Sequence, residues 1–248
     1  MGKTISLMYH CVYNEYTSES GFQNESAHLY KVKATEFEKQ VIAINRLIKN
    51  VDLFTFDDGG VSFYSVIAPI LEKHGVRGVF FISTKYIGTE KFLTKQQIQD
   101  LHKRGHIIAS HSHSHPDNIS SLSQEEIRNE WQLSKDILSE IIGEEVTSAS
   151  IPNGYASKDV YAIAEKCGYN KLYISKPTTK VSYYKGMEII GRYVIHDTTE
   201  LSTIMNIITS SGTRFKYEIR WVLISFVKLI LGNKFNKVKM FLMNIFKK

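Results

Sequence analysis

The residues with the clearest chemical potential are two adjacent carboxylates, Asp57 and Asp58, which are followed by Gly59 and Gly60. The apolar run 53–56 before them has the length and composition of a buried strand. We therefore expect the pair at the edge of a sheet or barrel. Adjacent carboxylates repel each other, so a fold that buries them needs a cation or a shared proton beside them.

A histidine-rich segment, His111-Ser112-His113-Ser114-His115-Pro116, offers the complement to this pair. In a helical turn, the i, i+4 spacing of His111 and His115 puts both imidazoles on one face and turns His113 away. In an extended segment, all three histidines share one side. Two imidazoles and one carboxylate suit Zn²⁺ or a similar divalent ion, with positions open for water and substrate. The alternative is a polar loop or a metal-collecting surface tract, and the carboxylate pair favours the first interpretation.

Short apolar runs that alternate with helical patterns must position these residues. The predicted strands are residues 5–9, 53–56, 78–83, 106–110, 149–152, 171–175 and 188–195. Helix starts are predicted at Thr35, Thr94 and Ser123, each with Glu or Gln three residues on, and at Ser157. Strands that alternate with helices predict a parallel α/β sheet. Six or seven strands before the tail favour a distorted (β/α) barrel of about seven strands, followed by C-terminal helices.

Several polar residues follow the predicted strands directly. They are His10, Asp57, Asp58, His111, Asn153 and His196. In parallel α/β barrels, active sites assemble at the carboxyl ends of the strands. The alternative is that polar residues merely begin loops, but the gathering of carboxylates and histidines favours a functional edge.

The charge of the chain is concentrated at one end. Residues 214–248 carry nine Lys/Arg and one Glu, whereas residues 1–213 carry 22 basic and 24 acidic side chains. We therefore predict a catalytic domain over 1–213 and a basic amphipathic helical tail over 214–248. A nucleic-acid-binding core would carry its basic stripe on the main fold, so we expect no nucleic-acid partner. Two cysteines and no visible secretory signal predict a reducing, cytoplasmic location.

The tail suggests a second partner. Its apolar run 221–231 contains Lys228 and is too short to span a bilayer. A basic amphipathic helix can instead lie on an anionic membrane surface. We therefore expect peripheral contact of residues 216–248 with the inner face of the membrane. The alternative is a pair of terminal helices packed on the barrel with a solvated basic face.

Together, the two motifs resemble those of a known enzyme family. Thr55-Phe56-Asp57-Asp58-Gly59 and His111-Ser112-x-x-His115-Pro116 are similar to the first two signatures of the polysaccharide deacetylases. These enzymes share a NodB-like homology domain and form carbohydrate esterase family 4. The resemblance continues in 7–10 and 80–82, and it covers roughly residues 4–210. It implies the NodB-like deacetylase fold.

The resemblance also implies a division of labour among the site residues. Asp57 would be the general base, and Asp58, His111 and His115 would hold one divalent metal ion, Zn²⁺ with Co²⁺ or Ni²⁺ as alternatives. The ion would activate water for attack on an acetamide carbonyl. The implied function is removal of N-acetyl groups from an amino sugar or glycan in bacterial surface-polysaccharide metabolism. The alternatives are a catalytically impaired glycan-binding scaffold and a deacetylase of O-acetyl esters.

The chain departs from the family at the third motif. An Arg-x-Pro-x-Gly pattern is replaced here by Ser150-Ile151-Pro152-Asn153-Gly154. The resemblance implies that Pro152, Asn153 and Gly154 line the substrate site. The family's arginine orients the catalytic base, and Ser150 stands in its place. We nominate Arg192 as the replacement cation; the alternative is an ordinary surface arginine.

The family's general acid is a histidine on a late strand. His196 is the late candidate in this chain, and Asp197 follows it directly. His10 also follows a predicted strand. It is a second candidate for the acid, or otherwise a residue that contacts substrate or braces the metal loop.

Overall fold

The computed structural model describes residues 3–48 and 53–231. Its main sheet has the spatial strand order β11-β1-β4-β5-β6-β7-β8-β10-β9. All neighbouring pairs in this sheet are parallel except β10 with β9. The strands are β1 (Leu7–Tyr9), β4 (Phe54–Phe56), β5 (Val79–Ile82), β6 (Ile107–Ser110), β7 (Ser148–Ser150), β8 (Lys171–Ile174), β9 (Ser182–Tyr184), β10 (Met187–Gly191) and β11 (Tyr193–Val194). A separate parallel pair joins β2 (Val12–Tyr13) and β3 (Val32–Lys33).

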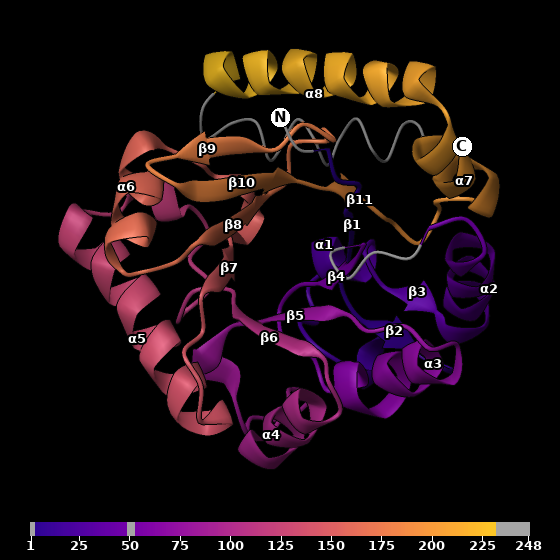
Figure 1. The fold of residues 1–248 in the computed structure, drawn as a ribbon, viewed down its shortest axis with the longest axis horizontal. Coiled ribbons are helices and arrows are strands. Elements are labelled where there is room, and N and C mark those ends of the chain that lie inside the picture. Colours follow the sequence, from indigo (N-terminus) through magenta and orange to yellow (C-terminus); the bar gives the residue numbers. More distant parts are fainter. Residues whose placement is uncertain (1–2, 49–52, 232–248) are drawn as a thin grey trace. The chain divides into compact units, whose positions relative to one another are not determined.

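Helices lie around the outside of this curled sheet (Figure 1). They are α2 (Ala34–Asn45), α3 (Ala68–Lys73), α4 (Lys95–Lys103), α5 (Gln124–Ile142), α6 (Lys158–Lys166) and α7 (Leu201–Thr209), and a further short helix, α1 (Glu25–His28), lies between β2 and β3 in the sequence. This arrangement confirms the predicted distorted (β/α) barrel. All seven predicted strand regions form strands, and the sheet gains β9 in addition.

Capping explains where several helices begin. Capping boxes of Thr94 with Gln97 and of Ser123 with Glu126 start α4 and α5, as predicted. The Ser157 side chain accepts a hydrogen bond from Val160 N at the start of α6. The prediction at Thr35 was wrong. Helix α2 already begins at Ala34 with Lys33 as its N-cap, and no side chain caps it.

The run 188–195, predicted as one strand, is split at Arg192. Its first part, β10, pairs with β8, whereas its second part, β11, pairs with β1. These two partners lie toward opposite ends of the sheet. The chain therefore crosses at Arg192 from one end of the curled sheet to the other, and it links both ends there. We call residues 191–193 the seam.

Strand alternation decides which side chains of β4 face the barrel interior. Phe54 and Phe56 pack against Phe37 of α2, at ring centroid distances of 6.5 and 5.7 Å. Thr55 lies between them in sequence, and successive side chains of a strand point to opposite faces. It therefore faces inward, where it accepts a hydrogen bond from Arg192. The same alternation sends Asp57 into the interior.

The chain divides into two compact units, of which the first ends at Thr209. The described part of the second contains helix α8 (Ser211–Leu231). Within the described residues, no helix is both long and apolar enough to cross a membrane. Residues 232–248 of the predicted tail lie outside the described residues, and the domain limits 1–213 and 214–248 stay a prediction.

Candidate active site

The candidate site lies where neighbouring parallel strands end. His10 follows β1, Asp57 and Asp58 follow β4, and His111 follows β6. Ser150 is the last residue of β7, the next strand in the sheet. Because the carboxyl ends of parallel strands meet at one edge, residues far apart in the sequence become neighbours here.

A strained backbone turns both carboxylates toward the same place. Simple alternation would send Asp57 and Asp58 to opposite faces of the sheet. Asp58 instead has φ 89°, a value that is uncommon for any residue except glycine. The chain turns sharply there, and both side chains are buried next to His111. Such strain costs about 1–3 kcal/mol and persists where surrounding contacts enforce it.

Three potential metal ligands converge at this turn. Ligand atoms of Asp58, His111 and His115 all lie within 4.8 Å of one another. Asp58 Oδ1 is 3.5 Å from His111 Nε2 and 3.4 Å from His115 Nε2. Ligand atoms bound at about 2.1 Å to a tetrahedral ion lie roughly 3.4 Å apart. The spacing and the donor set of two imidazoles and a carboxylate therefore fit one divalent ion such as Zn²⁺.

The histidine segment is a loop, neither the helical turn nor the extended strand considered from its spacing. Ser112 and His115 have φ values of 63° and 55°, which interrupt both regular conformations. His113 is turned away from the ligand group, and its Nδ1 is 2.9 Å from Thr84 Oγ1. Two left-handed residues, rather than helical periodicity, bring His111 and His115 together.

Glu130 of α5 holds this loop in place. Its carboxylate accepts hydrogen bonds from the backbone N–H groups of His113 and Ser114, at 2.9 and 2.8 Å. It also accepts one from the Ser114 hydroxyl at 2.6 Å. No local sequence pattern marks this residue, because it lies on a helix beyond the loop and looks like any half-exposed helical glutamate.

Asp57 forms a buried ion pair with Arg192. Arg192 Nη1 and Nη2 donate to Asp57 Oδ1 and Oδ2 at 2.6 and 2.8 Å. The Arg192 side chain is fully buried, and its guanidinium lies over the Phe81 and Tyr173 rings. Arg192 is therefore not a surface arginine. It occupies the seam and reaches the carboxylate from the barrel interior.

These contacts set the charge of both carboxylates. Burial raises the pKa of Asp57, but the Arg192 guanidinium, helped by His111, brings it below its usual value. Burial also raises the pKa of Asp58, yet the surrounding histidine rings, His10 foremost, hold it well below its usual range. Both groups are therefore ionised near neutral pH, as a general base and a metal ligand must be.

The two candidate acids, His10 and His196, both contact Tyr30. His10 is half-buried, and its buried Nδ1 has no hydrogen-bond partner within the described part of the chain. Burial lowers the pKa of His10, while the nearby Asp58 and Asp57 charges oppose that shift. Tyr30 contacts the His10 ring at 4.7 Å and the His196 ring at 4.8 Å, measured between centroids. One tyrosine thus links both histidines.

The predicted substrate loop follows β7. Pro152, Asn153 and Gly154 form a single 3₁₀ turn in which Pro152 is buried and Asn153 is exposed. Asn153 has φ 54°, and its Nδ2 donates to Pro116 O at 3.4 Å. The turn therefore lies beside the exit of the histidine loop. Contact with substrate stays a prediction.

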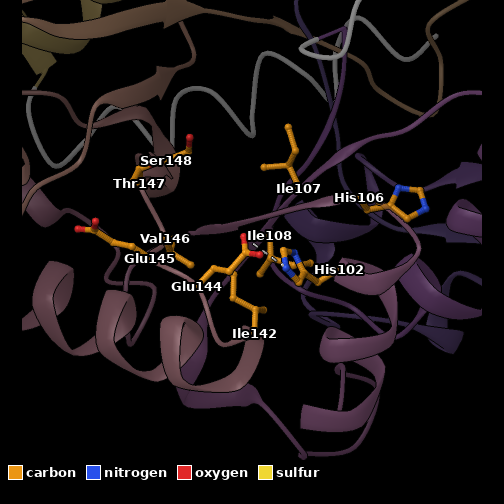
Figure 2. A pocket seen from close by; sticks show the side chains of 11 residues that line it. His102, His106, Ile107, Ile108, Ile142, Glu144, Glu145, Val146, Thr147 and Ser148 are labelled. Atoms are coloured by element: carbon orange, nitrogen blue, oxygen red, sulfur yellow. Dashed lines mark ion pairs between the residues drawn. The ribbon is translucent and has the colours of Figure 1, made fainter.

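A separate pocket of about 310 Å³ lies at the opposite ends of the strands. Its lining includes Ile107 and Ser148, the first residues of β6 and β7. His102 Nε2 is 3.7 Å from Glu144 Oε2 at its edge (Figure 2). None of the carboxylates or histidines of the candidate site lines this pocket.

Comparisons with known proteins agree with this geometry. The family described as "Polysaccharide deacetylase" matches residues 45–172, just over half of the chain. An uncharacterised 30.6 kDa protein of Geobacillus stearothermophilus is 36% identical over 123 residues, which are 49% of this chain and 44% of that protein. The peptidoglycan-N-acetylmuramic acid deacetylase PdaA of Bacillus subtilis is 27% identical over 146 residues, 53% of this chain and 54% of PdaA.

A solved structure shares the fold. The Streptococcus pyogenes deacetylase PplD, in complex with acetate, superposes with a TM-score of 0.68 at 22% identity, over 83% of this chain and 97% of that one. The sequence matches span only about half of each relative's length, so they establish kinship of the domain. With the family match over residues 45–172, the chain belongs to the polysaccharide deacetylase family.

Proposed function

We propose that the protein is a metal-dependent hydrolase that removes N-acetyl groups from an amino sugar or glycan. The observation that carries this proposal is the ionised Asp57, locked by Arg192 beside a three-residue group that fits one divalent ion. The relative PdaA, whose name specifies N-acetylmuramic acid, supports an N-acetylated sugar as substrate. A bacterial surface glycan or its precursor is the proposed setting.

The reaction needs an activated water, a base and an acid. A divalent ion held by Asp58, His111 and His115 would polarise the acetyl carbonyl and make water a better nucleophile. Asp57 accepts a proton as water attacks the carbonyl carbon. The C–N bond then breaks, and the leaving amine takes up a proton, so that acetate and a free amino sugar result. Arg192 keeps Asp57 ionised and fixed in orientation until the proton arrives.

We propose His10 as the proton donor in preference to His196. The charges of Asp58 and Asp57 raise the pKa of His10 against the lowering effect of burial, which supports a position close to both carboxylates. Its buried Nδ1 has no hydrogen-bond partner within the described residues, so this atom is available to a ligand. We therefore expect His10→Gln to lower kcat more than His196→Gln does.

The test is acetate release from N-acetylated sugars of increasing length, with bound metal measured in the same samples. We expect activity to disappear on chelation and to return with Zn²⁺, Co²⁺ or Ni²⁺. Asp57→Asn should lower kcat by about 10²–10⁴-fold, the usual contribution of a general base. Asp136→Asn, an exposed carboxylate on α5, is the matched control.

Three outcomes separate the alternatives. Unchanged activity of Asp57→Asn would refute the assignment of the base. Faster release of acetate from O-acetyl esters than from N-acetyl groups would identify an esterase. Tight binding of a divalent ion without hydrolysis of any acetylated sugar would favour a glycan-binding scaffold.

We also propose that α8 lies on an anionic membrane surface, with the enzyme at the inner face. Its exposed apolar residues Phe215, Ile219, Val222, Leu223 and Phe226 follow the spacing of one helix face. Lys216 and Arg220 are exposed as well. A second copy of the chain would bring the same basic charge, so an anionic partner suits this face better.

Sedimentation with vesicles tests the membrane proposal. We expect the full chain to bind vesicles rich in phosphatidylglycerol and to bind neutral phosphatidylcholine vesicles weakly. Removal of residues 216–248 should abolish this association. Equal binding of the truncated and full chains to anionic vesicles would refute the proposal.

A further inference from the structure

Ser150 stands where the family pattern has an arginine, and it is fully buried. Its hydroxyl oxygen is 2.6 Å from His111 Nδ1 and 3.4 Å from Asp57 Oδ1. One small side chain thus touches both a candidate metal ligand and the candidate base. These two residues follow different strands, so Ser150 connects the ends of β4 and β6 from the end of β7.

The backbone of Ser150 fixes the direction of these hydrogen bonds. His111 Nδ1 is also 3.2 Å from the Ser150 carbonyl oxygen, which can only accept. Nδ1 therefore carries the proton, and Nε2 presents its lone pair toward Asp58. The Ser150 hydroxyl accepts from Nδ1, which leaves its own proton for Asp57. The resulting chain runs from the imidazole through the hydroxyl to the carboxylate.

We propose that Ser150 is a positioning residue that ties the metal-binding orientation of His111 to the orientation of Asp57. This inference rests on the metal site of the proposed function. Ligating histidines commonly donate their second ring N–H to an oxygen, which fixes the tautomer and the ring orientation. Here the accepting oxygen also donates to the base, so a single hydroxyl sets the position of both groups.

The same position has no room for the family's arginine. The guanidinium of Arg192 already donates hydrogen bonds to both carboxylate oxygens of Asp57. Ser150 itself is enclosed, with no exposed surface. In this chain, therefore, the positive charge comes from the seam, and the end of β7 supplies a hydroxyl.

The test compares three substitutions of Ser150 in the full chain. Ser150→Ala removes the hydroxyl, Ser150→Cys keeps the size with a weak hydrogen-bonding group, and Ser150→Thr keeps the hydroxyl. Zn²⁺ affinity is measured by competition with a chromophoric chelator, and the ligand field by the visible spectrum of the Co²⁺-loaded protein. Turnover is separated into kcat and KM.

We expect Ser150→Ala and Ser150→Cys to weaken Zn²⁺ binding by about tenfold. The loss should lie at the lower end of the usual range, because the backbone carbonyl still accepts from Nδ1. The Co²⁺ spectrum should shift, and kcat should fall more than KM changes. Ser150→Thr should retain most of the affinity. The matched control is Ser83→Ala, a buried serine whose hydroxyl donates to the backbone oxygen of His111 rather than to its ring.

The inference fails if folded Ser150→Ala or Ser150→Cys binds Zn²⁺ and turns over as the wild type does. It also fails if Ser83→Ala matches their losses, because a general loss of packing would then explain them. Metal affinity and the Co²⁺ spectrum need no substrate. A wild type that binds Zn²⁺ through a Ser150-dependent site but releases no acetate would therefore overturn the proposed reaction and leave the positioning of His111 intact.

Discussion

The ion pair between Asp57 and Arg192 predicts a large and unusual stability effect. Substitution Arg192→Met removes the guanidinium but keeps an unbranched side chain that can pack against the Phe81 and Tyr173 rings. It leaves Asp57, whose side chain is 4% exposed, without its cation. Breaking a buried pair in this way costs about 3–5 kcal/mol, because the remaining charge is uncompensated. That is a large part of the stability of a typical domain, about 5–15 kcal/mol.

A double-mutant cycle isolates the reason for this loss. Asp57→Asn removes the charge that Arg192 compensates, so the Asp57→Asn/Arg192→Met variant buries no unpaired carboxylate. We therefore expect the double variant to be more stable than Arg192→Met alone, with a coupling energy of about 2 kcal/mol or more. Urea unfolding of all four proteins, followed by circular dichroism without added metal, measures the cycle. If Arg192→Met is too unstable to purify, Arg192→Lys replaces it, with a smaller expected loss.

The result that would refute this reasoning is additivity. If the two substitutions destabilise independently, Arg192 stabilises the protein through its packing in the seam and not through Asp57. A measurement of kcat tests the orientation of Asp57 separately from stability. Arg192→Lys keeps the charge but not the paired hydrogen bonds, so a lysine variant with full kcat would show that orientation of Asp57 is unimportant.

Three further predictions concern residues around the site and at the far end of the strands. His106 accepts a hydrogen bond from Gly78 N through Nδ1, and burial lowers its pKa despite Glu72. Folding therefore favours the neutral ring, and the stability that this gives is lost as the pH falls below the ordinary histidine pKa. We expect His106→Gln to reduce the fall of the urea unfolding midpoint between pH 7 and 5. An equally steep fall in the variant would contradict this prediction. Glu130→Ala should speed amide exchange at His113 and Ser114 and weaken Zn²⁺ binding, whereas Glu140→Ala on the same helix should do neither. Gly60→Ala should lower the unfolding free energy by about 1–3 kcal/mol, because its Cβ would overlap Cys11 Sγ and lie 2.6 Å from Ser20 Oγ; Cys11→Ala in the same chain should recover part of the loss.

Much of the fold was predictable because its signals are local. Short apolar runs, capping boxes at Thr94 and Ser123, and the alternation of strands with helices all follow from residues within a few positions. The predictions that failed concern positions where tertiary contacts override the local sequence signal. Helix α2 starts without the Thr35 cap, and the strand predicted over 188–195 breaks at Arg192 because its two halves have different partners.

The candidate site was likewise predictable only in part. The sequence pointed to Asp58, His111 and His115 as a group because parallel strands end at a common edge. It could not show how the group is built. The left-handed backbone at Asp58 and His115, and the carboxylate of Glu130 beneath the loop, depend on contacts that no spacing encodes. Ser150 drew attention only as a missing arginine, whereas its hydroxyl touches both His111 and Asp57.

The sequence alone determined which side chains are available for chemistry and which strand ends carry them, since both follow from residue type and short-range periodicity. Tertiary structure decided their partners. Arg192 and Asp57 are 135 residues apart, and they meet because the seam joins the two ends of a curled sheet. Such a contact depends on how the whole sheet closes. The charge that holds the base in place is therefore visible only in the folded barrel.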